Sequence, residues 1–157
     1  MNQAKYTFSS DFGSFCLTYS DNGLTSVRIE QPKEQEKLNS SAPDWVRSAA
    51  AQIAKSVAGL ATDLSAIPLD FENQPPFFSK VYRMARKVKF GKLTTYRELA
   101  TKAGSPLASR AVGQAMARNP WLIVVPCHRV LATGGGMGGF SAPGGVATKR
   151  KLLAAEQ

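Results

Sequence analysis

The sequence predicts an α+β protein built from two parts. Alternating apolar and polar residues near the N-terminus indicate strands, whereas apolar residues at helical spacing dominate the rest of the chain. Three prolines, Pro68, Pro75 and Pro76, separate the two patterns, and 157 residues are enough for two small domains. We therefore expect a small N-terminal α/β domain over residues 1–71 and a mostly helical C-terminal domain over residues 72–157.

The first thirty residues are expected to form strands. Residues 15–20 alternate with a period of two, and Asn22-Gly23 is a strong hairpin signal because both residue types tolerate positive φ. A return strand is predicted around residues 27–29. Residues 31–43 are polar, contain two prolines and predict a loop.

The next two elements are predicted helices. Apolar residues recur at helical spacing over residues 44–59, with Asp44 interpreted as the N-cap and Gly59 as the residue that ends the helix. A proline-containing connector over residues 60–76 leads to a helix over residues 77–88, which has one apolar and one basic side.

Two further short helices predict a helix-turn-helix. Thr95 and Glu98 have capping-box spacing, and the first helix is expected to stop at Gly104. We expect Ser105 to cap the second helix, which runs to about Arg118. Its small residues would let it lie close either to the core of the protein or to an external partner. They are Ala108, Ser109, Ala111, Gly113 and Ala115.

The end of the chain combines an apolar run, a glycine-rich stretch and a basic helix. Residues 122–125 are all apolar and predict a buried strand. Residues 134–145 contain seven glycines but lack the Gly-Lys-Ser/Thr ending of a phosphate-binding loop. Residues 146–157 read as a basic helix.

The excess of positive charge is confined to the second half of the chain. Residues 1–71 carry six basic and eight acidic side chains, whereas residues 72–157 carry 14 basic and three acidic ones. A net charge of −2 is thus followed by one of +11. Nucleic acid is the simplest partner for the second half, although basic surface also aids solubility.

Several other classes of protein do not fit this composition. The chain has no apolar stretch of membrane-spanning length, and its first residues lack the apolar core of a signal peptide. Its two cysteines, Cys16 and Cys127, are too few for a disulfide scaffold. With a single histidine and no close pair of cysteines, we expect no structural zinc site.

Cys127 and His128 are the residues most suggestive of chemistry. A thiol is nucleophilic as its thiolate, and His128 is the only imidazole that could act as its base, most simply through a bridging water. An acidic residue is then needed to orient the ring, and the second half offers Glu72, Glu98 and Glu156. The alternative is that both residues are ordinary core residues.

The residues around this pair favour the interpretation as a nucleophile and its base over that as ordinary core residues. Val-Pro-Cys-His-Arg-Val-Leu follows the small-residue helix and precedes the glycine-rich stretch. Together with residues 95–100, residues 109–116 and Asn119-Pro120, this motif resembles the O6-alkylguanine-DNA alkyltransferases. The resemblance is close over residues 76–157 and loose before them. It implies a ribonuclease-H-like N-terminal domain and a winged-helix-like C-terminal domain.

The resemblance implies a direct and irreversible alkyl transfer from guanine O6. Cys127 would be both nucleophile and acceptor, and His128 its base through a water. Glu156 would orient His128, and Asn119 would brace the turn before the cysteine. Tyr96 would crowd the rotated phosphate and protonate the departing guanine.

The resemblance also implies that the damaged base is flipped out of the duplex. Arg110 would take its place in the stack while the second helix lies in the minor groove. Residues implied to contact DNA or to bring the helix close to it are Arg97, Ser105, Ala108, Ser109, Ala111, Gly113 and Thr133. Residues implied to line the base pocket are Val130, Phe140 and Ser141.

Three features depart from the family pattern. Phe140 stands where several relatives have tyrosine, and the loop after Ser141 is longer than in some of them. Some relatives bind zinc in the N-terminal domain, a site that Cys16 alone cannot form. The resemblance therefore implies no metal or other cofactor here.

The expected partner is double-stranded DNA containing O6-alkylguanine, with no membrane involved. The protein is expected to be cytoplasmic, associated with the nucleoid during repair, and monomeric off DNA. The main alternative is a non-catalytic helix-turn-helix protein that recognises alkylated DNA. A transcriptional regulator would leave Cys127-His128 unexplained, and a cysteine hydrolase would leave the uneven charge unexplained.

Overall fold

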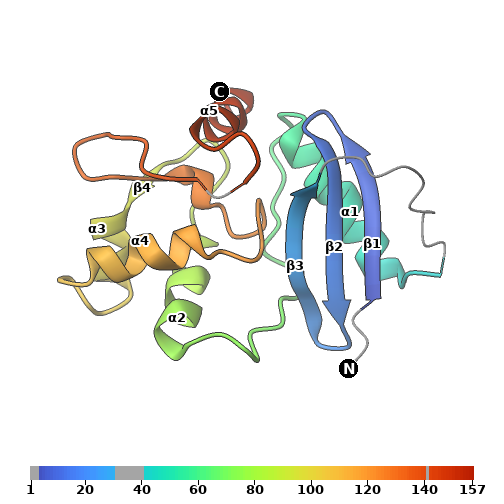
Figure 1. Cartoon of the computed structure of the whole chain (residues 1–157), viewed down its shortest axis with the longest axis horizontal. Coiled ribbons are helices and arrows are strands. Elements are labelled where there is room, and N and C mark those ends of the chain that lie inside the picture. Colours follow the sequence, from blue (N-terminus) through green and yellow to red (C-terminus); the bar gives the residue numbers. More distant parts are fainter. Residues whose placement is uncertain (1–3, 31–40, 141) are drawn as a thin grey trace.

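The computed structural model describes residues 4–30, 41–140 and 142–157, and it shows a mixed α/β protein. A sheet with one helix on its face forms one side of the molecule, and the remaining helices form the other (Figure 1). The predicted combination of strands followed by helices is confirmed at this level.

The first side is an antiparallel sheet in chain order, made of β1 (Ala4–Ser10), β2 (Gly13–Ser20) and β3 (Gly23–Glu30). The predicted turn joins β2 to β3. Gly23 has a φ of 146°, and a Cβ there would lie 2.7 Å from the backbone of Pro68. Glycine is therefore required here both by the turn and by the closely packed connector.

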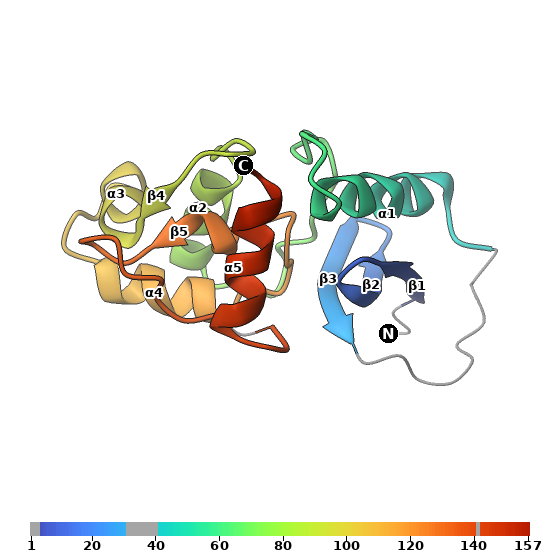
Figure 2. The same ribbon diagram turned by 90° about the horizontal axis from the view of Figure 1, so that it is seen from above.

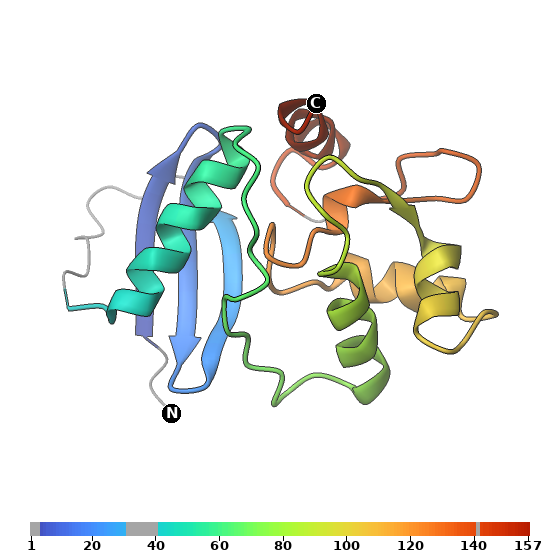
Figure 3. The same ribbon diagram turned by 180° about the vertical axis from the view of Figure 1, so that it is seen from behind.

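Helix α1 (Asp44–Val57) covers one face of the sheet (Figures 2 and 3). The predicted N-cap is wrong by one residue, because Pro43 occupies that position. Asp44 is already helical, and its carboxylate pairs with Arg47 instead of capping the backbone. Gly59 follows the helix with a φ of 91°, as expected for a residue that ends one.

The second side contains short elements joined by turns. The helices α2, α3 and α4 form its body, while α5 lies against the segment that carries Cys127 (Figure 2). The elements are α2 (Pro76–Ala85), β4 (Thr94–Thr95), α3 (Tyr96–Lys102), α4 (Ser109–Ala117), the 3₁₀ turn η1 (Cys127–Arg129), β5 (Val130–Leu131) and α5 (Val146–Ala155).

The predicted pair α3 and α4 is present, with one correction. Thr95 caps α3 by accepting a hydrogen bond of 3.1 Å from the Glu98 amide, as expected. Ser105, however, does not cap α4, whose N-cap position is Ala108. The Ala108 amide donates to the Ser105 carbonyl at 2.9 Å, so the Pro106 segment closes a separate turn before the helix begins.

The expected strand over residues 122–125 is wrong. The chain forms a tight buried turn instead, in which the Val125 amide donates to the Trp121 carbonyl at 2.9 Å. Ile123 lies at a φ of 72°, which is rare for a β-branched residue. An apolar run therefore correctly predicted burial, but burial does not distinguish a strand from a turn.

Two small features could not be read from periodicity. The strands β4 and β5 pair in parallel through only two residues each, too few to show a pattern. Cys127 and His128 lie in a 3₁₀ turn, which the sequence did not predict.

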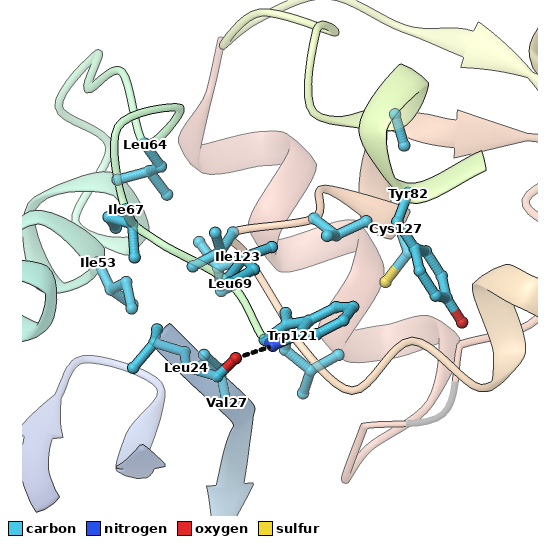
Figure 4. Packing of buried hydrophobic residues seen from close by; sticks show 14 of the residues in the cluster. Leu24, Val27, Ile53, Leu64, Ile67, Leu69, Tyr82, Trp121, Ile123 and Cys127 are labelled. Carbon is cyan, nitrogen blue, oxygen red and sulfur yellow. Dashed lines mark hydrogen bonds between the residues drawn. The ribbon is translucent and has the colours of Figure 1, made fainter. Parts of the chain in front are cut away.

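The two sides share one hydrophobic core. Along the edge of β3, the Leu24 amide donates to the Pro68 carbonyl at 2.8 Å and the Val27 amide donates to the Pro120 carbonyl at 2.8 Å. Trp121 Nε1 donates to the Leu24 carbonyl at 2.7 Å (Figure 4). The boundary between residues 71 and 72 stays a prediction. In the described ranges, every helix is too short or too polar to cross a membrane.

Candidate functional site

Cys127 lies immediately after the buried turn, at the start of η1, with 4% of its surface exposed. Its amide donates to the Val125 carbonyl at 2.8 Å, which fixes the backbone. Burial raises the pKa of the Cys127 thiol, while the Asn119 amide and the Lys149 ammonium act in the opposite direction. The thiol therefore stays protonated at neutral pH and needs a base to become a nucleophile.

His128 is suited to be that base. Its Nε2 lies 2.9 Å from Glu156 Oε1, and burial lowers the pKa of the imidazole so that the ring is neutral. A neutral ring that donates Nε2–H to the carboxylate leaves Nδ1 as an acceptor. Nδ1 is buried and finds no hydrogen-bond partner within the described residues.

Glu156 is held by more than the histidine. Arg129 donates to both carboxylate oxygens, with Nη2 2.7 Å from Oε1 and Nε 3.0 Å from Oε2. The Gly91 amide adds a third donor at 3.2 Å from Oε2. Burial acts to raise the pKa of Glu156, but the bonds from His128 and Arg129 outweigh it and hold this pKa at about 2. The carboxylate is therefore ionised throughout the physiological range.

Asn119 organises the turn that precedes Cys127. Its Oδ1 accepts from the Trp121 amide at 2.9 Å, and its Nδ2 donates to the Val125 carbonyl at 2.8 Å. One buried side chain thus ties together both ends of the turn. The geometry agrees with the bracing role expected of Asn119.

Tyr96 begins α3 and is partly buried beside the glycine-rich stretch. Burial raises the pKa of its phenol, with a smaller contribution from Cys127. A Cβ on Gly138 would lie 2.4 Å from the Tyr96 hydroxyl, so only glycine lets the loop approach so closely. The phenol is kept protonated and can act as a proton donor.

The expected base-pocket residues are only partly described. Val130 is fully buried, and its carbonyl already accepts a hydrogen bond from Lys149 at 2.8 Å. Phe140 is half-buried against the core. Ser141 lies outside the described residues.

The small residues of α4 other than Ala115 lie on its more accessible side. The face of α4 that packs into the core consists of Val112, Ala115 and Met116. A Cβ on Gly113 would meet no atom within 4 Å, so the packing of the protein itself does not require glycine there. Of the two explanations left open by the sequence, this favours an external partner. The other small residues, Ala108, Ser109 and Ala111, are each half-buried.

The basic residues expected to contact DNA are exposed. Arg110 is the second residue of α4, and Arg97 is the second residue of α3. Thr133 is exposed just after β5, and Ser105 is half-buried in the turn between the two helices. Arg97, Arg110 and Thr133 are thus accessible to an external partner.

Comparison with known proteins assigns the chain to a family. The sequence model of the 6-O-methylguanine DNA methyltransferase DNA-binding domain matches residues 76–157. A methylated-DNA–protein-cysteine methyltransferase of Metallosphaera sedula is 34% identical, over 96% of this chain and 90% of the relative. The chain belongs to this methyltransferase family.

Other members of the family agree. The Cricetulus griseus methylated-DNA–protein-cysteine methyltransferase is 34% identical, over 97% of this chain and 81% of its own length. The crystal structure of Mycobacterium tuberculosis OGT in complex with DNA has a TM-score of 0.76 at 34% identity, over 96% of this chain and 90% of the other. The similarity thus extends over both halves of this methyltransferase.

Lys149 is a residue of this methyltransferase site that sequence reasoning missed. Its side chain is fully buried, and its ammonium donates to the Val130 carbonyl at 2.8 Å and to the Met137 carbonyl. Nothing in a run of three basic residues distinguishes it. Its spacing could have indicated its burial. Lys149 lies three residues before Leu152 and seven before Glu156, so all three share one face of α5.

Tyr82 was also missed. Its hydroxyl donates to the Ala115 carbonyl of α4 at 2.8 Å, and its ring lies beside the Cys127 thiol (Figure 4). Burial, with a contribution from Cys127, raises the pKa of Tyr82 to about 12. Tyr82 therefore links α4 to the reactive cysteine, a role that the apolar side predicted for α2 could not reveal.

Proposed function

We propose that this protein repairs O6-alkylguanine in duplex DNA by transferring the alkyl group irreversibly to Cys127. The observation that carries the proposal is the buried Cys127-His128 pair, in which the imidazole lies 2.9 Å from the Glu156 carboxylate. The membership of the chain in the methyltransferase family supports the same conclusion.

The transfer needs one nucleophile, one base and one acid. The Cys127 thiol passes its proton through a water to Nδ1 of His128, and the sulfur attacks the alkyl carbon. The sulfur–carbon bond forms as the carbon–O6 bond breaks, and the electron pair remains on guanine. Tyr96 protonates the guanine at N3, and its phenolate later recovers the proton released by His128. The thioether is no leaving group, so each chain repairs one base.

Recognition of the base is assigned to residues 72–157. The accessible small residues of α4 fit a helix that lies in the minor groove. Arg110, the exposed second residue of α4, would fill the stack after the base is flipped. We further assign a winged-helix-like fold to this part and a ribonuclease-H-like fold to residues 1–71. The repair is proposed to occur in the cytoplasm, on the nucleoid.

Intact-mass analysis tests the transfer. The protein is incubated with a duplex that contains one O6-methylguanine, and its mass is compared before and after. We expect a gain of one methyl group on the peptide that contains Cys127, a plateau at one equivalent, and no gain in Cys127→Ser. A protein that binds the duplex without any change in mass would support the non-catalytic alternative.

Comparing two substrates tests the flipping role. Arg110→Ala should slow repair of the duplex far more than reaction with free O6-benzylguanine, because the free base needs no flipping. Lys80→Ala, an exposed change on α2, serves as the control. Equal losses with both substrates would argue against this role of Arg110.

A further inference from the structure

A second site lies on the other side of the molecule from α4. A cavity of about 730 Å³ lies between the connector after α1, the segment that ends α2, and the buried turn before Cys127. Figure 2 places α4 on one side of the molecule and this connector on the opposite side, and Figure 3 shows the connector from behind. The volume is in the range of small-molecule sites, which is about 300–1,000 Å³.

The walls of the cavity are apolar. Leu64, Val88, Ile123 and Val124 are buried lining residues that come from three separate segments. Phe90 adds a partly exposed aromatic ring. Such walls fit a ligand with an aromatic or aliphatic body.

The charge around the cavity is strongly positive. Five cationic side chains line it, against the single carboxylate of Asp63, and of the five only Arg129 is paired with an acidic residue, Glu156, in the described part of the chain. Two of the five, Lys87 and Lys89, are exposed and form no ion pair within the described part of the chain. The other three are Arg83, Arg86 and Arg129. A ligand with a negative group would therefore be favoured over a neutral one.

Arg86 is held in the wall of the cavity by the connector after α1. Its Nη2 donates to the carbonyls of Leu64, Ser65 and Ile67 at 2.8–3.2 Å. Its Nε is buried and has no hydrogen-bond partner among the described residues. The bonds from Nη2 fix the guanidinium of Arg86 against the connector, so a positive charge is held in the cavity wall.

The turn beside the cavity is also strained. Ile123, which lines the cavity, is the one non-glycine residue with positive φ in the described ranges. Strained residues of this kind concentrate at ligand and active sites. Arg129 also lines the cavity while it holds Glu156, so the cavity adjoins the back of the His128–Glu156 pair.

We propose that this cavity is a binding site for a small organic anion with an apolar body, of the aromatic carboxylate or sulfonate class. The site is separate from Cys127 and from α4, so the proposal does not depend on the proposed function. Apolar walls would hold the body, while Lys87, Lys89 and Arg86 would face the negative group.

Fluorescence and NMR titrations of the full chain with anilinonaphthalene sulfonate test the proposal. We expect saturable binding of one equivalent, with amide shifts concentrated in residues 61–65 and 86–90 and absent from α4. Neutral phenylnaphthylamine should bind about tenfold more weakly, which corresponds to ~1.4 kcal/mol. Equal binding of the neutral probe, or shifts elsewhere, would overturn the proposal.

A pair of charge-matched variants sharpens the test. The double variant Lys87→Glu, Lys89→Glu should weaken binding of the sulfonate about tenfold and leave the neutral probe unaffected. The control Lys55→Glu, Lys80→Glu changes net charge by the same amount at exposed residues outside the cavity and should bind like the parent. Equal weakening in both double variants would show attraction by net charge alone and would refute the site.

Discussion

The N-terminal sheet and the C-terminal helical part bury different kinds of side chain. Among the described residues, the buried polar side chains of the first part are the uncharged Thr18 and Ser56. The second part buries His128, Arg129 and Lys149. Burying a charge is costly unless it is paired, so the second part gives up stability to hold an ionised cluster beside Cys127. The comparison shows that the reactive site lies in the part of the core that contains charged side chains.

The largest expected effect comes from removing the buried carboxylate. Glu156→Gln leaves the guanidinium of Arg129 buried without a counter-charge, and we expect the free energy of unfolding to fall by about 3–5 kcal/mol. Alkyl transfer should fall as well, because the imidazole loses its orienting partner. Urea denaturation and the mass assay measure the two effects.

The control for this change is Glu98→Gln. Glu98 is exposed and accepts from Thr94 Oγ1 at 2.8 Å, a bond that a glutamine can still accept. Its effect on stability should stay within about 0.5 kcal/mol. A loss for Glu156→Gln no larger than this would remove the contrast between the two parts of the molecule.

The same cluster should make the protein sensitive to acid. The pKa of Glu156 is about 2 in the folded protein and about 4.5 in an unfolded chain. Its contribution to the free energy of unfolding is therefore present above pH 4.5 and is lost as the pH falls toward 2. That contribution is roughly 3 kcal/mol. Burial lowers the pKa of His128 in the folded protein, so the free energy of unfolding should already begin to decrease as the pH falls below 6.5.

Urea denaturation at a series of pH values measures this dependence. Stability should decline in two stages, and Glu156→Gln should remove the stage between pH 4.5 and 2. The same decline in the variant and the parent would assign the acid sensitivity to other groups.

Lys149→Met should have a smaller effect on stability but a specific effect on the thiol. It leaves two buried carbonyls without their charged donor, at a cost of about 2 kcal/mol. Because the ammonium lowers the pKa of Cys127, its loss should move thiol alkylation by iodoacetamide to higher pH. The exposed Lys151→Met on the same helix is the control and should leave both measurements unchanged.

The smallest effect concerns the contact between the two parts. Gly59 and Gly135 both have a φ near 90°, but only at Gly59 would a Cβ meet a nearby atom, 2.8 Å from the Ala155 carbonyl. Gly135→Ala should cost the backbone strain alone, about 1 kcal/mol, and Gly59→Ala about 1 kcal/mol more. Thermal unfolding measures the difference. Equal losses of stability in the two variants would show that the end of α5 next to Glu156 moves easily to make room for the added Cβ.

Much of the fold followed from local patterns. The turn at Asn22-Gly23, the Thr95 cap and the helical end at Gly59 depend on a few neighbouring residues, and each was confirmed. The local patterns failed where residues distant along the chain or in space determine the backbone conformation. Residues 122–125 are buried on every side, so their apolar run could not show that Asn119 bends them into a turn.

The sequence by itself determined the two-part fold class, the uneven charge and the Cys127-His128 pair, because composition, periodicity and a short motif are properties of adjacent residues. Only the tertiary structure decided that Arg129 and Lys149 are buried around the site and that a cavity lies behind it. Glu156 is 28 residues from His128, and their contact depends on how α5 packs, which no local pattern specifies.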